Sequence, residues 1–265
     1  MRWRIMAKKN FLDAYRKWSL GIAAITFVLF LTVPVYMGMS RTNAPGDADF
    51  FSVVGFVVFL VPLSALMMSY DAIAGERELG SLKLLLALPY TRRDVVTGMA
   101  VGRAAVVGTA AMVGIFTATI AFLVFGGTVQ VGSYLSFLVL VLLLTAAYTA
   151  SGVCFSAVSP TSNRAMATSV GFLLLTLIGW SSIAQLLRYV LNGFSRPSGG
   201  RPEWAVAVDS LSPIQAYSNG MNTPVHTNGP VSSFYNTGWF ALLVLVAWAV
   251  IPVILGYRRF ASVDI

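Results

Sequence analysis

Six stretches of the chain consist almost wholly of apolar residues, and each is about as long as a membrane-spanning helix. A helix rises about 1.5 Å per residue, so about 20 residues cross the roughly 30 Å of hydrocarbon in a bilayer. None of these stretches contains Asp, Glu, Lys or Arg. The pattern predicts an all-α polytopic membrane protein with six transmembrane helices: Trp18–Met39, Phe50–Tyr70, Ala104–Phe125, Tyr134–Val158, Ala165–Leu187 and Gly238–Tyr257.

Residues 1–17, before the first span, predict an amphipathic helix that lies in the membrane interface with its basic side chains toward anionic headgroups. The alternative is a plain basic flank of the first span. A cleaved signal peptide is not expected, because the apolar stretch exceeds 7–15 residues and Met37–Ser40 offers no small-x-small cleavage site. The apolar residues Phe11, Leu12, Tyr15 and Trp18 share one face, and Lys8, Lys9, Arg16 and Lys17 lie largely on the other.

Residues 188–237 predict a long extracellular loop before the last span and are rich in Gly, Pro, Ser and Asn. Connections longer than about 15 residues tend to be functional or disordered. Within this one, Trp204–Val208 and Leu211–Tyr217 are apolar enough to pack at the membrane surface as short re-entrant pieces. We see no internal repeat, and expect residues 1–265 to form a single transmembrane domain.

Composition and charge agree with a membrane protein and set its orientation. The chain is 57% hydrophobic, 11% charged and has a mean hydropathy of +0.77, whereas soluble domains carry about 25% charged residues. Of its 18 Lys and Arg residues, 14 lie on the side of the N-terminus and 4 on the other. The positive-inside rule places both termini in the cytoplasm. The net charge of +8 therefore reflects topology, and we expect no nucleic-acid partner.

The most charged stretch between two spans is residues 71–103, which we call the coupling segment. It predicts a helix over Asp71–Leu79, a break near Gly80, and a second amphipathic helix over Ser81–Leu88 that stops at Pro89. Thr91, with Asp94 three residues on, has the spacing of a capping box for a third helix that continues into the next span. A helix–break–helix beneath two spans offers a cytoplasmic partner a surface to push on.

Two glycine spacings in this segment and the following span could indicate a nucleotide site or a helix contact. Gly75 and Gly80 have the spacing of a phosphate-binding loop, but Ser81 follows where that motif requires Lys, so we reject nucleotide binding by this chain. The second pattern is a stripe of small residues that lets helices approach closely, either within the chain or between two copies. Its members are Gly98, Gly102, Ala110, Gly114 and Ala118.

The coupling segment resembles the ABC-2 type permeases, the membrane subunits of a class of ATP-binding-cassette transporters. The resemblance rests on Asp-x-Ile-x-Gly-Glu-Arg-Glu-x-Gly-Ser-Leu from position 71, then Leu-Leu, then Pro-x-Thr-Arg from position 89. The six-span layout and the tail from Tyr257 extend it along the chain. It is closest to the stand-alone prokaryotic permeases that include the nitrous-oxide-reductase maturation type. Gly98-Met99 departs from the Gly-Lys of many members.

This resemblance implies a permease in the cell membrane of a prokaryote that works as a homodimer with two separate ATPase subunits. Members of the family are mostly exporters. ATP and Mg²⁺ would bind on the ATPase, so this chain would be no enzyme and hold no cofactor. The coupling segment would seat in the ATPase cleft. The residues implied in that coupling are Asp71, Glu76, Arg77, Glu78, Gly80, Ser81, Pro89, Arg92 and Arg93.

Other functions fit the sequence less well. An ion-driven carrier or an ATP-independent assembly factor is the main alternative, although the spans lack the ionisable residues that such carriers usually bury. A membrane enzyme needs a polar cluster, yet His226 is the single histidine, and Asp47 and Asp49 fit solvated loop residues better than a cation site. Methionines suit Cu(I), but they also fill gaps between helices; those considered are Met37, Met39, Met67 and Met68.

Overall fold

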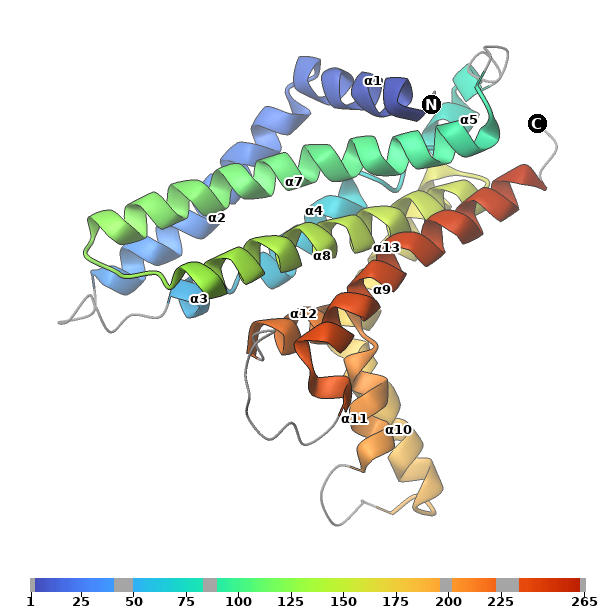
Figure 1. The fold of residues 1–265 in the computed structure, drawn as a ribbon. Coiled ribbons are helices and arrows are strands. Elements are labelled where there is room, and N and C mark those ends of the chain that lie inside the picture. Colours follow the sequence, from blue (N-terminus) through green and yellow to red (C-terminus); the bar gives the residue numbers. More distant parts are fainter. Residues whose placement is uncertain (1–2, 41–49, 83–89, 196–201, 223–233, 263–265) are drawn as a thin grey trace.

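Five long apolar helices dominate the part of the chain that the structure, a computed structural model, describes: residues 3–40, 50–82, 90–195, 202–222 and 234–262 (Figure 1). Each is long and apolar enough to cross a membrane, and each covers one predicted span. The prediction of an all-α polytopic membrane protein is therefore confirmed. The five are α2 (Ser19–Met39), α7 (Arg92–Val124), α8 (Val131–Val158), the continuous helix Ser162–Leu191, and α13 (Gly238–Ala261).

The sixth predicted span, Phe50–Tyr70, is not one continuous helix. It consists of α3 (Phe50–Val53) and the 11-residue α4 (Val57–Met67), separated by a turn around Gly55. In that turn the N–H of Val57 donates to the carbonyl of Val54 at 3.0 Å, a tighter pairing than that of an α-helix. Glycine favours such a break because it loses more conformational freedom in a helix than other residues. The structure thus places helices within the predicted span and divides it into two pieces.

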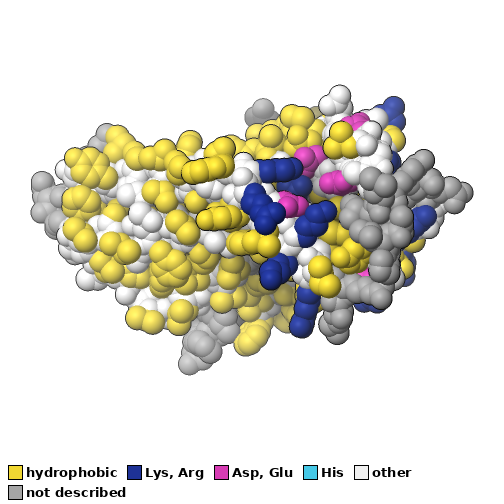
Figure 2. All heavy atoms as spheres, turned by 90° about the horizontal axis from the view of Figure 1, so that it is seen from above, with side chains coloured by type: hydrophobic (Ala, Val, Ile, Leu, Met, Phe, Trp, Pro, Cys, Tyr) yellow, Lys and Arg dark blue, Asp and Glu magenta, His cyan; other side chains and the backbone are white. Residues whose placement is uncertain are grey.

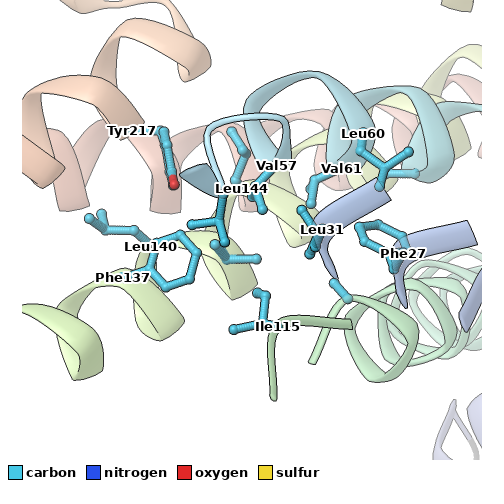
Figure 3. Close-up of a cluster of buried hydrophobic side chains, with 14 of the residues drawn as sticks. Phe27, Leu31, Val57, Leu60, Val61, Ile115, Phe137, Leu140, Leu144 and Tyr217 are labelled. Carbon is cyan, nitrogen blue, oxygen red and sulfur yellow. The ribbon is translucent and has the colours of Figure 1, made fainter. Parts of the chain in front are cut away.

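The main core lies where α2, α4, α7 and α8 meet, and α12 (Pro213–Asn222) closes it from one end (Figure 3). Its side chains are large and apolar, and most are completely buried. At about 25 cal/mol per Å² of apolar surface buried, this cluster supplies much of the packing between helices. The labelled members are Phe27, Leu31, Val57, Leu60, Val61, Ile115, Phe137, Leu140, Leu144 and Tyr217.

Other helices of the same chain pack against the stripe of small residues on α7. A Cβ on Gly98 would lie 2.6 Å from the Cβ of Met6, and a Cβ on Gly102 would lie 2.8 Å from the Cβ of Asn10. Both contacts are made by α1 (Trp3–Arg16), the predicted interfacial helix. Farther along α7, a Cβ on Gly114 would lie 2.7 Å from the Cβ of Phe27 in α2. The structure therefore places the stripe in contacts between α7 and α1 or α2, and Ala110 and Ala118 are buried with it.

Helix α1 has a second face that the sequence did not indicate. Met6 and Ala14 are buried, while Leu12, Tyr15 and Trp18 of the predicted apolar face are exposed on this chain. One face of α1 thus packs on α7 and another, apolar face is left for the membrane interface.

We expect Gly98→Ala to loosen α1, because the added methyl group meets both the Met6 side chain and the Trp3 carbonyl at 2.9 Å. Overpacking of this kind destabilises by about 1–3 kcal/mol. Gly108→Ala is the matched control on the same helix, since its new Cβ would meet only the end of the Leu142 side chain, at 3.4 Å. Limited proteolysis in α1 should be faster in Gly98→Ala alone; equal rates in both variants would contradict the packing described.

The fourth long helix, which covers the fifth predicted span, changes its winding in the middle. It comprises α9 (Ser162–Leu174), the π-helical segment η2 (Leu175–Gly179) and α10 (Trp180–Leu191). The hydroxyl of Tyr148 in α8 donates to Thr176 in η2 at 2.8 Å, and both side chains are buried. This bond joins the wide turn of η2 to the core.

The predicted connection 188–237 contains α11 (Glu203–Ser210), α12 and η3 (Phe234–Asn236), and His226 lies outside the described residues. The indole N–H groups of Trp180 and Trp248 donate to the carbonyls of Val208 and Leu211, each at 2.9 Å. These bonds tie the last turn of α11 to α10 and the residue after α11 to α13. Residues 41–49, with Asp47 and Asp49, are likewise outside the described ranges.

Candidate coupling site

Charged side chains gather over one end of the molecule, where α1, α5 (Ala74–Glu78) and the ends of the chain lie (Figures 1 and 2). The other half of the surface in Figure 2 is mostly hydrophobic. Helix α7 has 33 residues and is about 50 Å long, well over the roughly 30 Å of a bilayer core. Its charged end can therefore extend beyond the membrane together with α1 and α5.

The start of α7 has the capping box that the sequence predicted. The Thr91 hydroxyl accepts from the N–H of Asp94 at 3.1 Å, and the Asp94 carboxylate accepts from the N–H of Thr91 at 3.2 Å. This reciprocal pair satisfies N–H groups that a helix start otherwise leaves without partners. It sets where the coupling segment ends and α7 begins.

Helix α5 is shorter than the predicted helix over Asp71–Leu79, because the chain forms turns as far as Ile73. The N–H groups of Ile73 and Ala74 both donate to the Oγ of Ser156 in α8, each at 2.9 Å. All three residues are fully buried. A single serine hydroxyl therefore accepts from both N–H groups at the base of α5 and fixes that base to α8.

Arg77 and Glu78 bind α5 to the turn between α8 and α9. The Arg77 guanidinium donates to the carbonyls of Ser159 at 2.9 Å and Ala157 at 3.3 Å, at the negative end of the α8 dipole. Partial burial lowers the pKa of Arg77. The Glu78 carboxylate accepts from the N–H of Ser162 at 3.0 Å, at the positive start of α9. The two opposite charges thus match the two helix ends that they contact.

The remaining predicted residues of the segment also have partners within the chain. Asp71 forms an ion pair with Arg103 of α7, with 3.6 Å between Oδ1 and Nη2. Glu76 accepts a hydrogen bond from the Ser81 hydroxyl. Gly80 has a φ of +72°, so the predicted break falls on the residue type that best tolerates a left-handed conformation. The expected helix Ser81–Leu88 and Pro89 lie mostly outside the described residues, which resume at Tyr90.

The two arginines at the start of α7 differ in environment. Arg92 donates to the carbonyl of Phe260 at 2.7 Å and thereby joins α7 to the last turn of α13. Arg93 is exposed and lines two surface hollows. Among the described residues, Arg92 therefore joins two helices and Arg93 does not.

The sequence did not single out Leu79, Ser156 or Ser162. Leu79 is 82% exposed at the tip of α5, beside the left-handed Gly80. A large apolar side chain at the tip of a short helix, whose base is fixed by hydrogen bonds, is suited to insert into a pocket of another protein. Leu79 lies inside the resemblance motif, where its apolar character could have marked it; nothing local marks Ser156 or Ser162.

The fold and this site define a polytopic helical membrane protein with a small, rigidly held helix outside its bundle. The sequence profile described as ABC-2 family transporter protein matches residues 4–265. The chain therefore belongs to the ABC-2 family of transporter proteins.

Two curated proteins are similar to part of the chain. It is 33% identical over 135 residues to a probable ABC transporter permease protein NosY of Stutzerimonas stutzeri, covering 49% of this chain and 48% of that protein. It is 35% identical over 129 residues to a protein of the same name from Pseudomonas aeruginosa, covering 46% and 45%. The chain thus spans about half the length of the curated relatives that it matches.

Proposed function

We propose that this chain is the permease subunit of an ATP-binding-cassette transporter and exports a substrate across the cell membrane. ATP and Mg²⁺ bind on a separate ATPase subunit, so the permease itself is not an enzyme. It works as a pair of identical copies, each with one ATPase, and both termini are cytoplasmic. Family membership and the printed names of the two relatives support this proposal.

The observation that carries the proposal is the way in which α5 is held. Its tip presents Leu79 to the surroundings, while its base is bonded to α8 and α9 through Ser156, Arg77 and Glu78. A force applied at the tip therefore reaches two long helices directly. An ATPase that closes on ATP supplies such a force.

Co-expression with the candidate ATPase subunit of the same organism tests the pairing. We expect affinity-tagged permease to recover the ATPase in equal amounts, and light scattering to give a mass with two copies of each. Recovery of the permease without any ATPase, together with uptake or efflux by the permease alone in liposomes, would instead support an ATP-independent carrier. A cellular function that persists after deletion of the ATPase gene would do the same.

A further inference from the structure

An apolar groove of about 400 Å³ lies between α7 and α13, with α8 beneath it. The side chains along it are mostly small, which is why the two helices leave a gap. Alanines from all three helices line it: Ala100, Ala104, Ala146, Ala150 and Ala249.

The groove has a polar end and an apolar end. Arg93 and Tyr257 lie at the end where Arg92 donates to the carbonyl of Phe260, so that end is the charged end of the molecule. From there the groove follows α7 as far as Ala104, eleven residues or about 16 Å. This length is close to half of the roughly 30 Å hydrocarbon core, the depth of one leaflet.

Arg93 is placed to bind an anion at the polar end. Its side chain is exposed, and its guanidinium has no hydrogen-bond or ion-pair partner in the ranges that the structure describes. Arg93 also lines a second hollow of about 470 Å³, together with Trp3, Asp94, Thr97 and Val101. The acidic member of that hollow, Asp94, accepts hydrogen bonds from Thr91 and is held at the helix start.

We propose that the groove binds an anionic phospholipid, with the phosphate on Arg93 and one acyl chain along the alanines. Arginine matches phosphate oxygens with paired N–H donors. Trp3 and Tyr257 are residue types enriched at membrane interfaces, as the headgroup position requires. Arg258 and Arg259, both exposed beside Tyr257, add positive charge at this end. The proposal does not depend on the ATPase pairing.

We assign the groove to a lipid chain rather than to a helix of a second copy because Arg93 places a positive charge at its polar end. An acyl chain is much thinner and is as apolar as the lining. The charge complementarity at Arg93 then favours an anionic lipid over a zwitterionic one.

Native mass spectrometry of the full chain in detergent tests the headgroup site with phosphatidylglycerol and phosphatidylcholine of equal chain length. We expect phosphatidylglycerol to bind about fivefold more tightly, and Arg93→Gln to remove that preference without weakening phosphatidylcholine. Arg164→Gln is the matched control, an exposed arginine at the start of α9 that does not line the groove. No preference in the unaltered chain, or equal losses in both variants, would overturn the proposal.

Two variants test whether an acyl chain lies in the groove. Ala249→Phe should fill the groove and weaken both lipids severalfold, whereas Ala105→Phe, exposed on α7 outside the groove, should not. Displacement of phosphatidylglycerol by glycerophosphoglycerol, which has no chains, would overturn this half. So would a disulfide between two copies of Ala249→Cys in a Cys154→Ser background, because the groove would then lie at an interface. The Arg93 comparison remains decisive if Ala249→Phe does not fold.

Discussion

Replacing Leu79 by Asp is expected to weaken the proposed pairing with the ATPase on the order of a hundredfold. Burial of a leucine side chain stabilises by about 1.5–3 kcal/mol, and a buried unpaired carboxylate adds a further penalty. The fold itself should be unaffected, because Leu79 is 82% exposed and lies beyond the hydrogen bonds at the base of α5. The recovery of ATPase with tagged permease, measured by titration, gives the change in affinity.

Phe194→Asp provides the matched control for that experiment. Phe194 is also a large exposed side chain, at 68%, and it follows α10, about 45 Å along the helix Ser162–Leu191 from the end that contacts Glu78. Its φ of +61° is one that Asp tolerates well. We expect this variant to keep full ATPase recovery. Equal recovery with Leu79→Asp would mean that the tip of α5 is not the contact.

The coupling segment shows which features of such a site can be predicted from sequence. The capping box of Thr91 and Asp94 and the break at Gly80 were predicted correctly, because both depend on residues at most three positions apart. The start of α5 was not, because Ile73 and Ala74 bond to a serine more than 80 positions away. No local pattern reveals that such a hydroxyl will be present.

The same limit applies to the charges of the segment and to the second span. Arg77 and Glu78 look like contacts for a partner when only their own helix is considered, whereas both contact the ends of α8 and α9. Gly55 was visible in the sequence, but it lies in a long apolar run that indicates a span more strongly than it indicates a turn. The periodicity of apolar residues thus predicted where helices lie, and not how one segment holds another.

Ser156→Ala tests directly how α5 is attached to α8. Without the hydroxyl, the buried N–H groups of Ile73 and Ala74 lose their shared acceptor. A buried donor left without a partner costs about 1–3 kcal/mol, so about 2 kcal/mol for local opening is a conservative expectation. Amide hydrogen exchange at Ile73 and Ala74 should then be about thirtyfold faster. Binding of the ATPase should persist because Leu79 remains at the tip.

Ser151→Ala distinguishes the loss of this acceptor from the loss of any buried serine. Ser151 is also buried in α8, but its hydroxyl donates to the carbonyl of Ala147 within the same helix. That variant should leave exchange at Ile73 and Ala74 unchanged. Because α5 would stay bound to its partner but loosely attached to α8, Ser156→Ala should also reduce the cellular function of the transporter while the ATPase is still recovered. Retained function with thirtyfold faster exchange would show that movement reaches the long helices through Arg77 and Glu78 without the serine.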